Sequence, residues 1–298
     1  MHSTPRTWLN TLDARLERRL PAPAYAAMLR AAAGARTLAG REPGMSHVLP
    51  DFVIIGAAKA GTTSVYAWLC EHPGVRRADR KEIHYFSFQP HRGLGWYRRH
   101  FPTLDDREHA AADGRPFITG EASPSYMLDP RVPARMARAL PDVRLIALLR
   151  NPVDRAYSQF HMRRRTGHEP LESFAAALAA EDPGFAGQPA AGHRNEAGRT
   201  YLSRGRYAEQ LERWLAHFPR EQLYVMSTEE LSHDPRGALA GLHGFLELPP
   251  FPEQPLEPRF TAEYDPMPAD DRARLIDYFR PYNRALYELL GKEFAWDR

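Results

Sequence analysis

Short hydrophobic runs alternate with amphipathic segments along most of the chain after residue 50. The apolar runs at 52–55 and 143–149 are typical of strands covered on both faces. Two more strands are expected within 116–126 and 222–227, and 82–88 is expected to be a short extended or turn segment. Strands that alternate with helices predict an α/β fold, in which helices flank both faces of a parallel β-sheet and the crossovers are right-handed.

Helical periodicity fills the intervals between these strands. In one expected helix, Asp129 is the predicted N-cap and Pro130 the first helical residue. Another contains Tyr207, Leu211 and Trp214 on its predicted inner face, together with Leu215 and Phe218. The helices are expected at 63–70, 129–141, 152–165, 171–181, 205–218, 235–248 and 270–290, with one or two helical turns at 93–101.

The pattern divides the chain into a helical extension over residues 1–47 and one α/β domain over residues 48–298. Four leucines between Leu9 and Leu20 fall at helical spacing in the extension, where they predict a surface helix. That helix is expected to pack on the domain or on a second subunit, so a homo-oligomer is possible. Attachment to a membrane surface is the alternative. Residues 182–203, rich in Gly, Pro and charge, are expected to form a long loop.

Composition narrows the classes of function. The net charge is +3, from 40 basic and 37 acidic residues, so bulk binding to nucleic acid is not implied. A single cysteine, Cys70, excludes an internal disulfide and a cysteine-rich metal site. No apolar run approaches the ~20 residues of a membrane span, and charges interrupt every candidate signal sequence. We therefore expect a cytoplasmic protein without stable membrane insertion.

A glycine-bearing turn joins the first predicted strand to the next helix. Gly56 and Gly61 have the spacing of a nucleotide-triphosphate loop, but the lysine lies earlier, at Lys59, and two threonines follow Gly61. Backbone N–H groups at a helix N-terminus, three consecutive hydroxyls and a lysine favour phosphate binding over an ordinary strand–helix turn.

The residue after the 143–149 run is Arg150, where a magnesium-dependent NTPase usually has an aspartate. An arginine at this position binds an anion directly and repels a metal ion. The sequence therefore predicts a nucleotide whose phosphates are held by protein cations, with no metal required.

These segments resemble the sulfotransferases that use 3′-phosphoadenosine 5′-phosphosulfate (PAPS), particularly the heparan-sulfate and carbohydrate branch. GAAKAGTTS is similar to the 5′-phosphosulfate loop of that family, and KEIHYF is similar to its catalytic segment. LIALLRNPVDRAYSQF resembles the segment that binds the 3′-phosphate, and GRYAEQLERWLAHFPREQLYV the helix and strand that follow. The combination is specific and spans residues 51 to about 248. The resemblance therefore implies that residues 48–298 form a sulfotransferase domain.

The resemblance implies roles for individual residues in binding PAPS. Lys59 would neutralise charge on the bridging oxygen and the 5′-phosphate. Arg150 and Ser158 would bind the 3′-phosphate of PAPS and of its product, adenosine 3′,5′-bisphosphate. The remaining implied contacts to the 5′-phosphate come from Ala60, Gly61, Thr62, Thr63 and Ser64.

The same resemblance makes Glu82 the general base for an acceptor hydroxyl. His84, two residues later, points the same way if the segment is extended, and either orients Glu82 or shares the proton transfer. His84 as the base is the alternative. Lys81 balances local charge or contacts the acceptor.

Other polar residues have two interpretations. Glu121 and Ser123, in a segment resembling an acceptor-cleft wall, either line the site or serve packing and turn formation. The arginines at 98–99 and 163–165 either attract an anionic glycan or, as we favour, form solvated helix faces. The animal enzymes close the 3′-phosphate site with a lysine–glycine loop held by a cysteine pair, which this chain lacks. Arg259 or Tyr264 is the candidate substitute.

The predicted function is transfer of a sulfuryl group from PAPS to an acceptor hydroxyl, most simply on a glycan. A lipid or polyketide hydroxyl is the alternative acceptor, and a P-loop kinase is a further alternative that Arg150 disfavours. A protein that binds adenosine 3′,5′-bisphosphate without turnover is the non-enzymatic alternative, which the Glu82 and His84 pair argues against.

Overall fold

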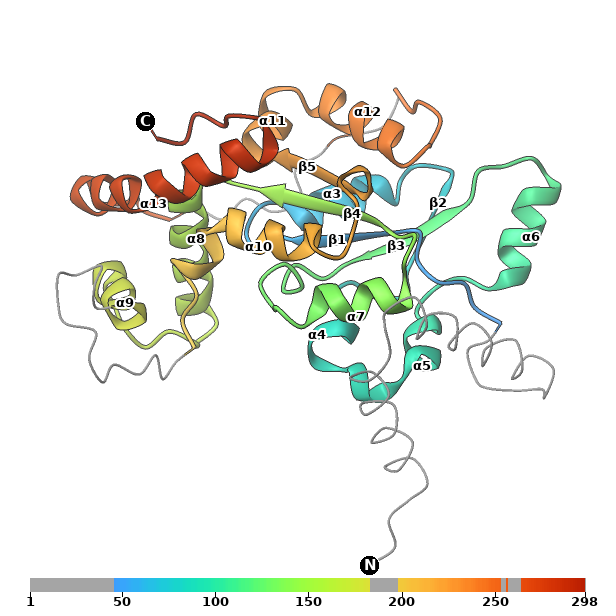
Figure 1. Ribbon diagram of the computed structural model, residues 1–298, viewed down its shortest axis with the longest axis horizontal. Coiled ribbons are helices and arrows are strands. Elements are labelled where there is room, and N and C mark those ends of the chain that lie inside the picture. Colours follow the sequence, from blue (N-terminus) through green and yellow to red (C-terminus); the bar gives the residue numbers. More distant parts are fainter. Residues whose placement is uncertain (1–45, 183–197, 253–255, 257–263, 298) are drawn as a thin grey trace, which may run out of the picture.

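A computed structural model describes residues 46–182, 198–252, 256 and 264–297 of the chain. Within them, five parallel strands form one sheet in the order β2-β3-β1-β4-β5 (Figure 1). The predicted parallel α/β fold is therefore confirmed. The strands are β1 (Phe52–Gly56), β2 (Val75–Arg77), β3 (Ile118–Ala122), β4 (Arg144–Leu149) and β5 (Leu223–Ser227).

Helices lie on both faces of the sheet. Figure 1 shows α11 and α12 along one side of it and α4, α5 and α7 on the opposite side. The helices are α3 (Thr62–Leu69), α4 (Tyr85–Phe88), α5 (Leu94–Arg98), α6 (Leu104–Ala112), α7 (Val132–Ala139), α8 (Pro152–Arg165), α9 (Phe174–Glu181), α10 (Tyr207–Leu215), α11 (Thr228–His233), α12 (Pro235–Phe245) and α13 (Ala269–Leu290). Short 3-10 turns occur at Pro90–Arg92, Ser203–Gly205 and Arg220–Gln222.

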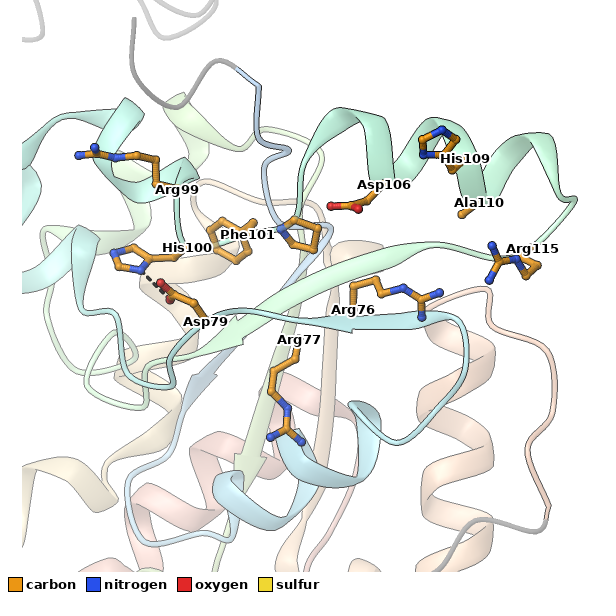
Figure 2. A pocket seen from close by; sticks show the side chains of 11 residues that line it. Arg76, Arg77, Asp79, Arg99, His100, Phe101, Asp106, His109, Ala110 and Arg115 are labelled. Carbon is orange, nitrogen blue, oxygen red and sulfur yellow. Dashed lines mark hydrogen bonds and ion pairs between the residues drawn. The ribbon is translucent and has the colours of Figure 1, made fainter.

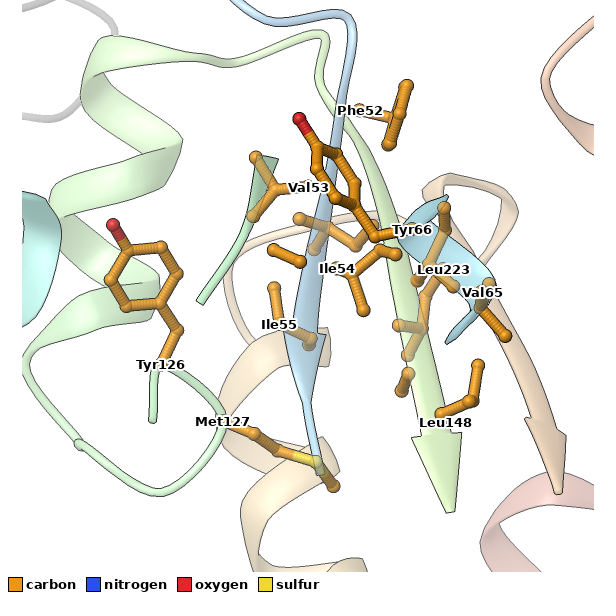
Figure 3. Close-up of a cluster of buried hydrophobic side chains, with 14 of the residues drawn as sticks. Phe52, Val53, Ile54, Ile55, Val65, Tyr66, Tyr126, Met127, Leu148 and Leu223 are labelled. Carbon is orange, nitrogen blue, oxygen red and sulfur yellow. The ribbon is translucent and has the colours of Figure 1, made fainter. Parts of the chain in front are cut away.

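The central strand β1 is the middle of the hydrophobic core. All five of its residues are buried, and its side chains pack among those of α3, β4 and β5 (Figure 3). Burying each large apolar side chain contributes about 1.5–3 kcal/mol relative to exposure. The continuous apolar runs of β1 and β4 thus follow from helices covering both faces, and they fix the strand ends from which the polar loops emerge.

The structure differs from the local predictions at three places. β2 was not expected, because it is a three-residue edge strand containing two arginines. The 82–88 segment is a turn followed by α4. Helix α7 begins at Val132, because the Asp129 carboxylate accepts a hydrogen bond from the Arg131 N–H at 3.0 Å and forms a turn before the helix. Most of the predicted extension and most of the predicted 182–203 loop lie outside the described residues.

A buried histidine pair between α3 and α12 predicts sensitivity of the fold to acid. His72 and His243 are both buried, with ring centroids 5.0 Å apart. Burial, and then the nearby His72, lower the pKa of His243 from 6.5 to about 4. The unfolded chain therefore takes up a proton on His243 at higher pH than the folded chain. The stabilising contribution is complete above about pH 6.5 and is lost as the pH falls toward 4.

We expect His243→Gln to remove this part of the pH dependence, which amounts to about 3 kcal/mol between pH 7.5 and pH 4. Urea unfolding of wild type and variant across that range measures it, since the other titrating groups are common to both proteins. Parallel stability curves for the two proteins would contradict the prediction.

Candidate active site

Most of the predicted site residues that the structure describes lie at one edge of the sheet. Because all five strands are parallel, their carboxyl ends lie along the same edge, where ligands of open α/β sheets bind. The 57–61 loop follows β1, the 78–84 segment follows β2, and the 123–127 turn follows β3. Arg150 follows β4, and Thr228 follows β5.

The loop between β1 and α3 is held in a tight conformation. Gly61 has φ 87°, a left-handed value that glycine adopts without steric cost, and Lys59 also has a positive φ of 74°. The Arg150 guanidinium donates a hydrogen bond to the Lys59 carbonyl at 3.2 Å. The Thr228 hydroxyl lies 2.9 Å from both the Ala60 and the Leu149 carbonyl oxygens. Residues from β4 and β5 thus fix the turn that precedes α3.

The turn places the ammonium group of Lys59 near other positively charged side chains. Burial lowers the pKa of Lys59, and the charges of Arg165, Arg150 and Lys81 lower it further. No carboxylate contributes to this shift. A half-buried lysine surrounded by arginines is unfavourable until an anion binds between them, so the arrangement fits phosphate or sulfate.

The groups predicted for the 5′-phosphate lie around the start of α3. Ala60 is fully buried, and its N–H donates a hydrogen bond to the Ala57 carbonyl at 3.2 Å. The Thr62 side chain is also buried, whereas Thr63 and Ser64 are half-buried and Gly61 is exposed. The first turn of α3 contains no acidic residue, as suits a helix N-terminus that faces an anion.

The predicted 3′-phosphate residues lie on the next strand end and helix. Arg150 is half-buried, and its carbonyl accepts a hydrogen bond from the Tyr207 hydroxyl at 2.8 Å. Asn151 caps α8, and Ser158 is buried on that helix. Tyr264 stacks on His161 of α8 with ring centroids 4.5 Å apart. The other candidate for closing this site, Arg259, lies outside the described residues.

Glu82 and His84 are in contact, but not through an extended strand. Both have left-handed backbones, with φ 59° and 56°. The Glu82 N–H donates to the Ala122 carbonyl at 3.1 Å, which ties the turn to the end of β3. Glu82 Oε2 lies 3.3 Å from His84 Nε2, and Oε1 lies 2.8 Å from Lys81 Nζ. A turn therefore brings together the pair that an extended segment was expected to align.

These contacts keep the Glu82 carboxylate ionised. The hydrogen bond from His84 lowers its pKa most, burial opposes the shift, and Lys81 lowers the pKa further, to about 2. The group is a charged hydrogen-bond acceptor at every pH near neutrality.

Two roles were considered for Glu121, lining the acceptor site or packing in the core, and the structure supports packing. Its side chain is fully buried, and it accepts hydrogen bonds from Tyr97 at 2.8 Å and Ser123 at 2.6 Å. Burial raises its pKa. Glu121 therefore supports the end of β3 from within the core and does not line a cleft.

One residue near Lys59, Thr228, was missed in the sequence. Thr228 follows an apolar strand and lies within the capping box formed by Ser227 and Glu230, so a strand-end position was the available signal. Arg165 is exposed, as predicted for a solvated helix face, and its charge also lowers the pKa of Lys59.

A separate hollow of about 510 Å³ lies beside β2 and α6 (Figure 2). Arginines line it, including Arg76, Arg77, Arg99 and Arg115, but none of the predicted site residues does. Asp79 within it accepts from His100 at 2.7 Å. The site at the strand ends is therefore distinct from this hollow.

Fold and site together define a class of protein: a parallel α/β protein with an anion-binding loop between its central strand and the following helix. Comparison with known proteins narrows the class. The sulfotransferase domain family matches residues 49–267. The chain belongs to the sulfotransferase family.

Among its relatives is human heparan sulfate glucosamine 3-O-sulfotransferase 3B1, 32% identical over 279 residues, covering 85% of this chain and 66% of the relative. The membrane-associated sulfotransferase kil1 of Dictyostelium discoideum is 27% identical over 319 residues, covering 83% and 66%. The chain thus spans just under two thirds of the length of these relatives. A crystal structure of a sulfotransferase from Alicyclobacillus acidocaldarius is similar with a TM-score of 0.63 and 31% identity, covering 84% of this chain and all of that one. None of the described helices is long and apolar enough to span a membrane.

Proposed function

We propose that the chain transfers a sulfuryl group from PAPS to a hydroxyl group of a carbohydrate, and that residues 48–298 form the transferring domain. The observation that carries this proposal is the placement of Lys59 among Arg150, Arg165 and Lys81. Lys81 in turn pairs with the carboxylate of Glu82 at 2.8 Å. Such a site binds an anionic donor, and one of its cations holds a carboxylate that can accept a proton.

In this proposal the donor lies across two strand ends. The backbone from Ala60 to Ser64, with the hydroxyls of Thr63 and Ser64, holds the 5′-phosphate, and Arg150 and Ser158 hold the 3′-phosphate. Arg259 is proposed to complete the second site. The cations take the place that a metal ion has in NTPases, so we propose that no metal is required.

PAPS supplies the sulfuryl group, and its bond from sulfur to the bridging oxygen breaks with the electron pair left on the 5′-phosphate. Glu82 accepts the proton of the acceptor hydroxyl as the oxygen of that hydroxyl bonds to sulfur. A carboxylate with a low pKa suffices, because the hydroxyl becomes strongly acidic only while that bond forms. Lys59 stabilises the charge that develops on the leaving oxygen.

The names of the heparan sulfate relatives support a glycan acceptor. The structure adds an exposed aromatic ring beside His84, the histidine that contacts the proposed base. Phe88 is 64% exposed, and its ring centroid lies 5.2 Å from that of His84. A flat apolar surface at this point suits the C–H face of a sugar ring. A lipid or polyketide hydroxyl is the alternative acceptor, and cytoplasmic location and a homo-oligomer remain predictions.

A thermal-shift titration tests the donor site. Adenosine 3′,5′-bisphosphate in EDTA is expected to stabilise the wild-type protein by about 2.7 kcal/mol at a hundredfold excess over Kd. Arg150→Ala should lose most of this shift, because a charge-assisted contact to the 3′-phosphate is removed. The matched control is Arg284→Ala, an exposed arginine on α13.

A shift seen only with ATP and magnesium would replace this proposal with the kinase alternative. Release of adenosine 3′,5′-bisphosphate from PAPS, dependent on heparan oligosaccharides but not on simple alcohols, then tests the acceptor class. Turnover with long-chain alcohols alone would favour the lipid alternative.

A further inference from the structure

The segment after β3 contacts His84 at its backbone N–H and at its ring nitrogen Nδ1. Its anchor is Glu121, which is fully buried and accepts hydrogen bonds from Ser123 Oγ at 2.6 Å and from the hydroxyls of Tyr97 and Tyr126 at 2.8 and 3.0 Å. Three donors on one buried carboxylate leave Ser123 little freedom to rotate, because each lost bond would leave a polar group unsatisfied in the core.

Ser123 in turn holds the backbone of His84. The Ser123 hydroxyl donates to Glu121 and accepts from the His84 N–H at 3.1 Å. Since a hydroxyl has one proton, donation to Glu121 directs its lone pairs toward His84. This contact helps to keep His84 in its left-handed conformation, from which its ring faces Glu82.

The ring of His84 has a different partner at each nitrogen. Nδ1 lies 2.9 Å from Ser125 Oγ, and Nε2 lies 3.3 Å from Glu82 Oε2. The Glu82 carboxylate only accepts hydrogen bonds, because Lys81 at 2.8 Å keeps it charged. Nε2 must therefore carry a proton for the contact to be attractive. In the neutral ring Nδ1 is then an acceptor, and the Ser125 hydroxyl is its donor.

We propose that Ser123 and Ser125 are positioning residues that hold His84 in one orientation and in the tautomer protonated at Nε2. In that tautomer His84 donates to Glu82 and cannot itself act as the base, because its free nitrogen faces Ser125. This inference rests on the proposed function, in which Glu82 takes the proton from the acceptor. It assigns His84 the task of orienting Glu82.

Nitrogen-15 NMR of the full chain tests the tautomer without any turnover. The protein is labelled at its histidines and observed at pH 8, and the signals of His84 are identified among the 13 histidines by their absence in His84→Gln. We expect protonated Nε2 and unprotonated Nδ1 in the wild-type protein. Ser125→Ala should introduce the opposite tautomer, and Ser125→Thr, which keeps the hydroxyl, should restore the wild-type spectrum.

Ser87→Ala is the matched control. The Ser87 hydroxyl contacts the His84 carbonyl at 3.4 Å but not the ring, so its removal should leave the tautomer unchanged. Protonated Nδ1 in the wild-type protein, or an unchanged tautomer in Ser125→Ala, would overturn the inference.

Kinetics give a second readout. Ser125→Ala is expected to lower kcat about tenfold, with KM for PAPS unchanged within twofold, because the donor site does not involve Ser125. Ser125→Thr should recover most of the loss, and Ser87→Ala should show none. An equal loss in Ser125→Ala and Ser87→Ala would mean that the serine serves only packing. Absence of any transfer by the wild-type protein would overturn the proposed function, whereas the NMR result decides the positioning role separately.

Discussion

Glu82→Gln is expected to lower kcat by about 10²- to 10⁴-fold, the range for loss of a general base. Glutamine keeps the shape of the side chain and a carbonyl oxygen to face His84, but it cannot accept the proton of the acceptor hydroxyl. The affinity for adenosine 3′,5′-bisphosphate should change little, because Glu82 contacts Lys81 and His84 rather than the residues proposed for the two phosphates. Turnover with PAPS and a thermal shift with the bisphosphate measure the two effects separately.

Glu108→Gln provides the matched control, since Glu108 is an exposed glutamate on α6. Its turnover should equal that of the wild-type protein. Full activity in Glu82→Gln would remove Glu82 as the base and leave the donor site intact. Loss of the thermal shift in the same variant would instead indicate that the turn had been disrupted.

Lys59→Met should reduce kcat by about 10²- to 10³-fold, the cost of removing one group that stabilises developing charge in the transition state. The methylene chain is largely retained, while the charge facing the leaving oxygen is lost. Because burial and three neighbouring cations lower the pKa of Lys59, the free enzyme should lose this charge at a lower pH than an ordinary lysine would. Binding of the donor in the wild-type protein should therefore weaken as the pH rises, at a lower pH than it would with a lysine of ordinary pKa.

Lys59→Arg separates charge from geometry, since it restores the cation but not its compact shape. We expect donor binding close to wild type and only partial recovery of kcat. Lys292→Met, a lysine that pairs with Glu230, controls for the loss of a positive charge. Equal kcat in Lys59→Met and the wild-type protein would exclude Lys59 from the chemical step.

The parts of the site that could be predicted are those that depend on local sequence patterns, such as hydrophobic runs and the residues that follow them. The apolar runs of β1 and β4 identified buried strands, and in parallel sheets the residues at their ends, Lys59 and Arg150, lie at one edge. The helix expected at 152–165 likewise matches α8.

Long-range contacts explain what was missed. The turn at Glu82 depends on a hydrogen bond to Ala122, 40 residues away, and the loop at Ala60 is closed by Thr228, which follows β5. Neither contact leaves a periodic pattern in the sequence. β2 was missed for a local reason. Its two arginines are acceptable on an edge strand, but they leave too few apolar residues for the segment to be identified as a strand.

The left-handed backbones at Lys59, Glu82 and His84 affect which substitutions at these positions would stabilise the protein. Among the described residues, only five other than glycine have a positive φ, and three of these are the proposed catalytic residues. Each such conformation costs about 1–2 kcal/mol in a residue with a side chain. Glycine at any of the three positions would relieve that cost and remove the chemistry. Selection for thermostability alone would therefore favour glycine at these three positions and so produce inactive proteins. Keeping the functional side chains costs the folded protein some stability.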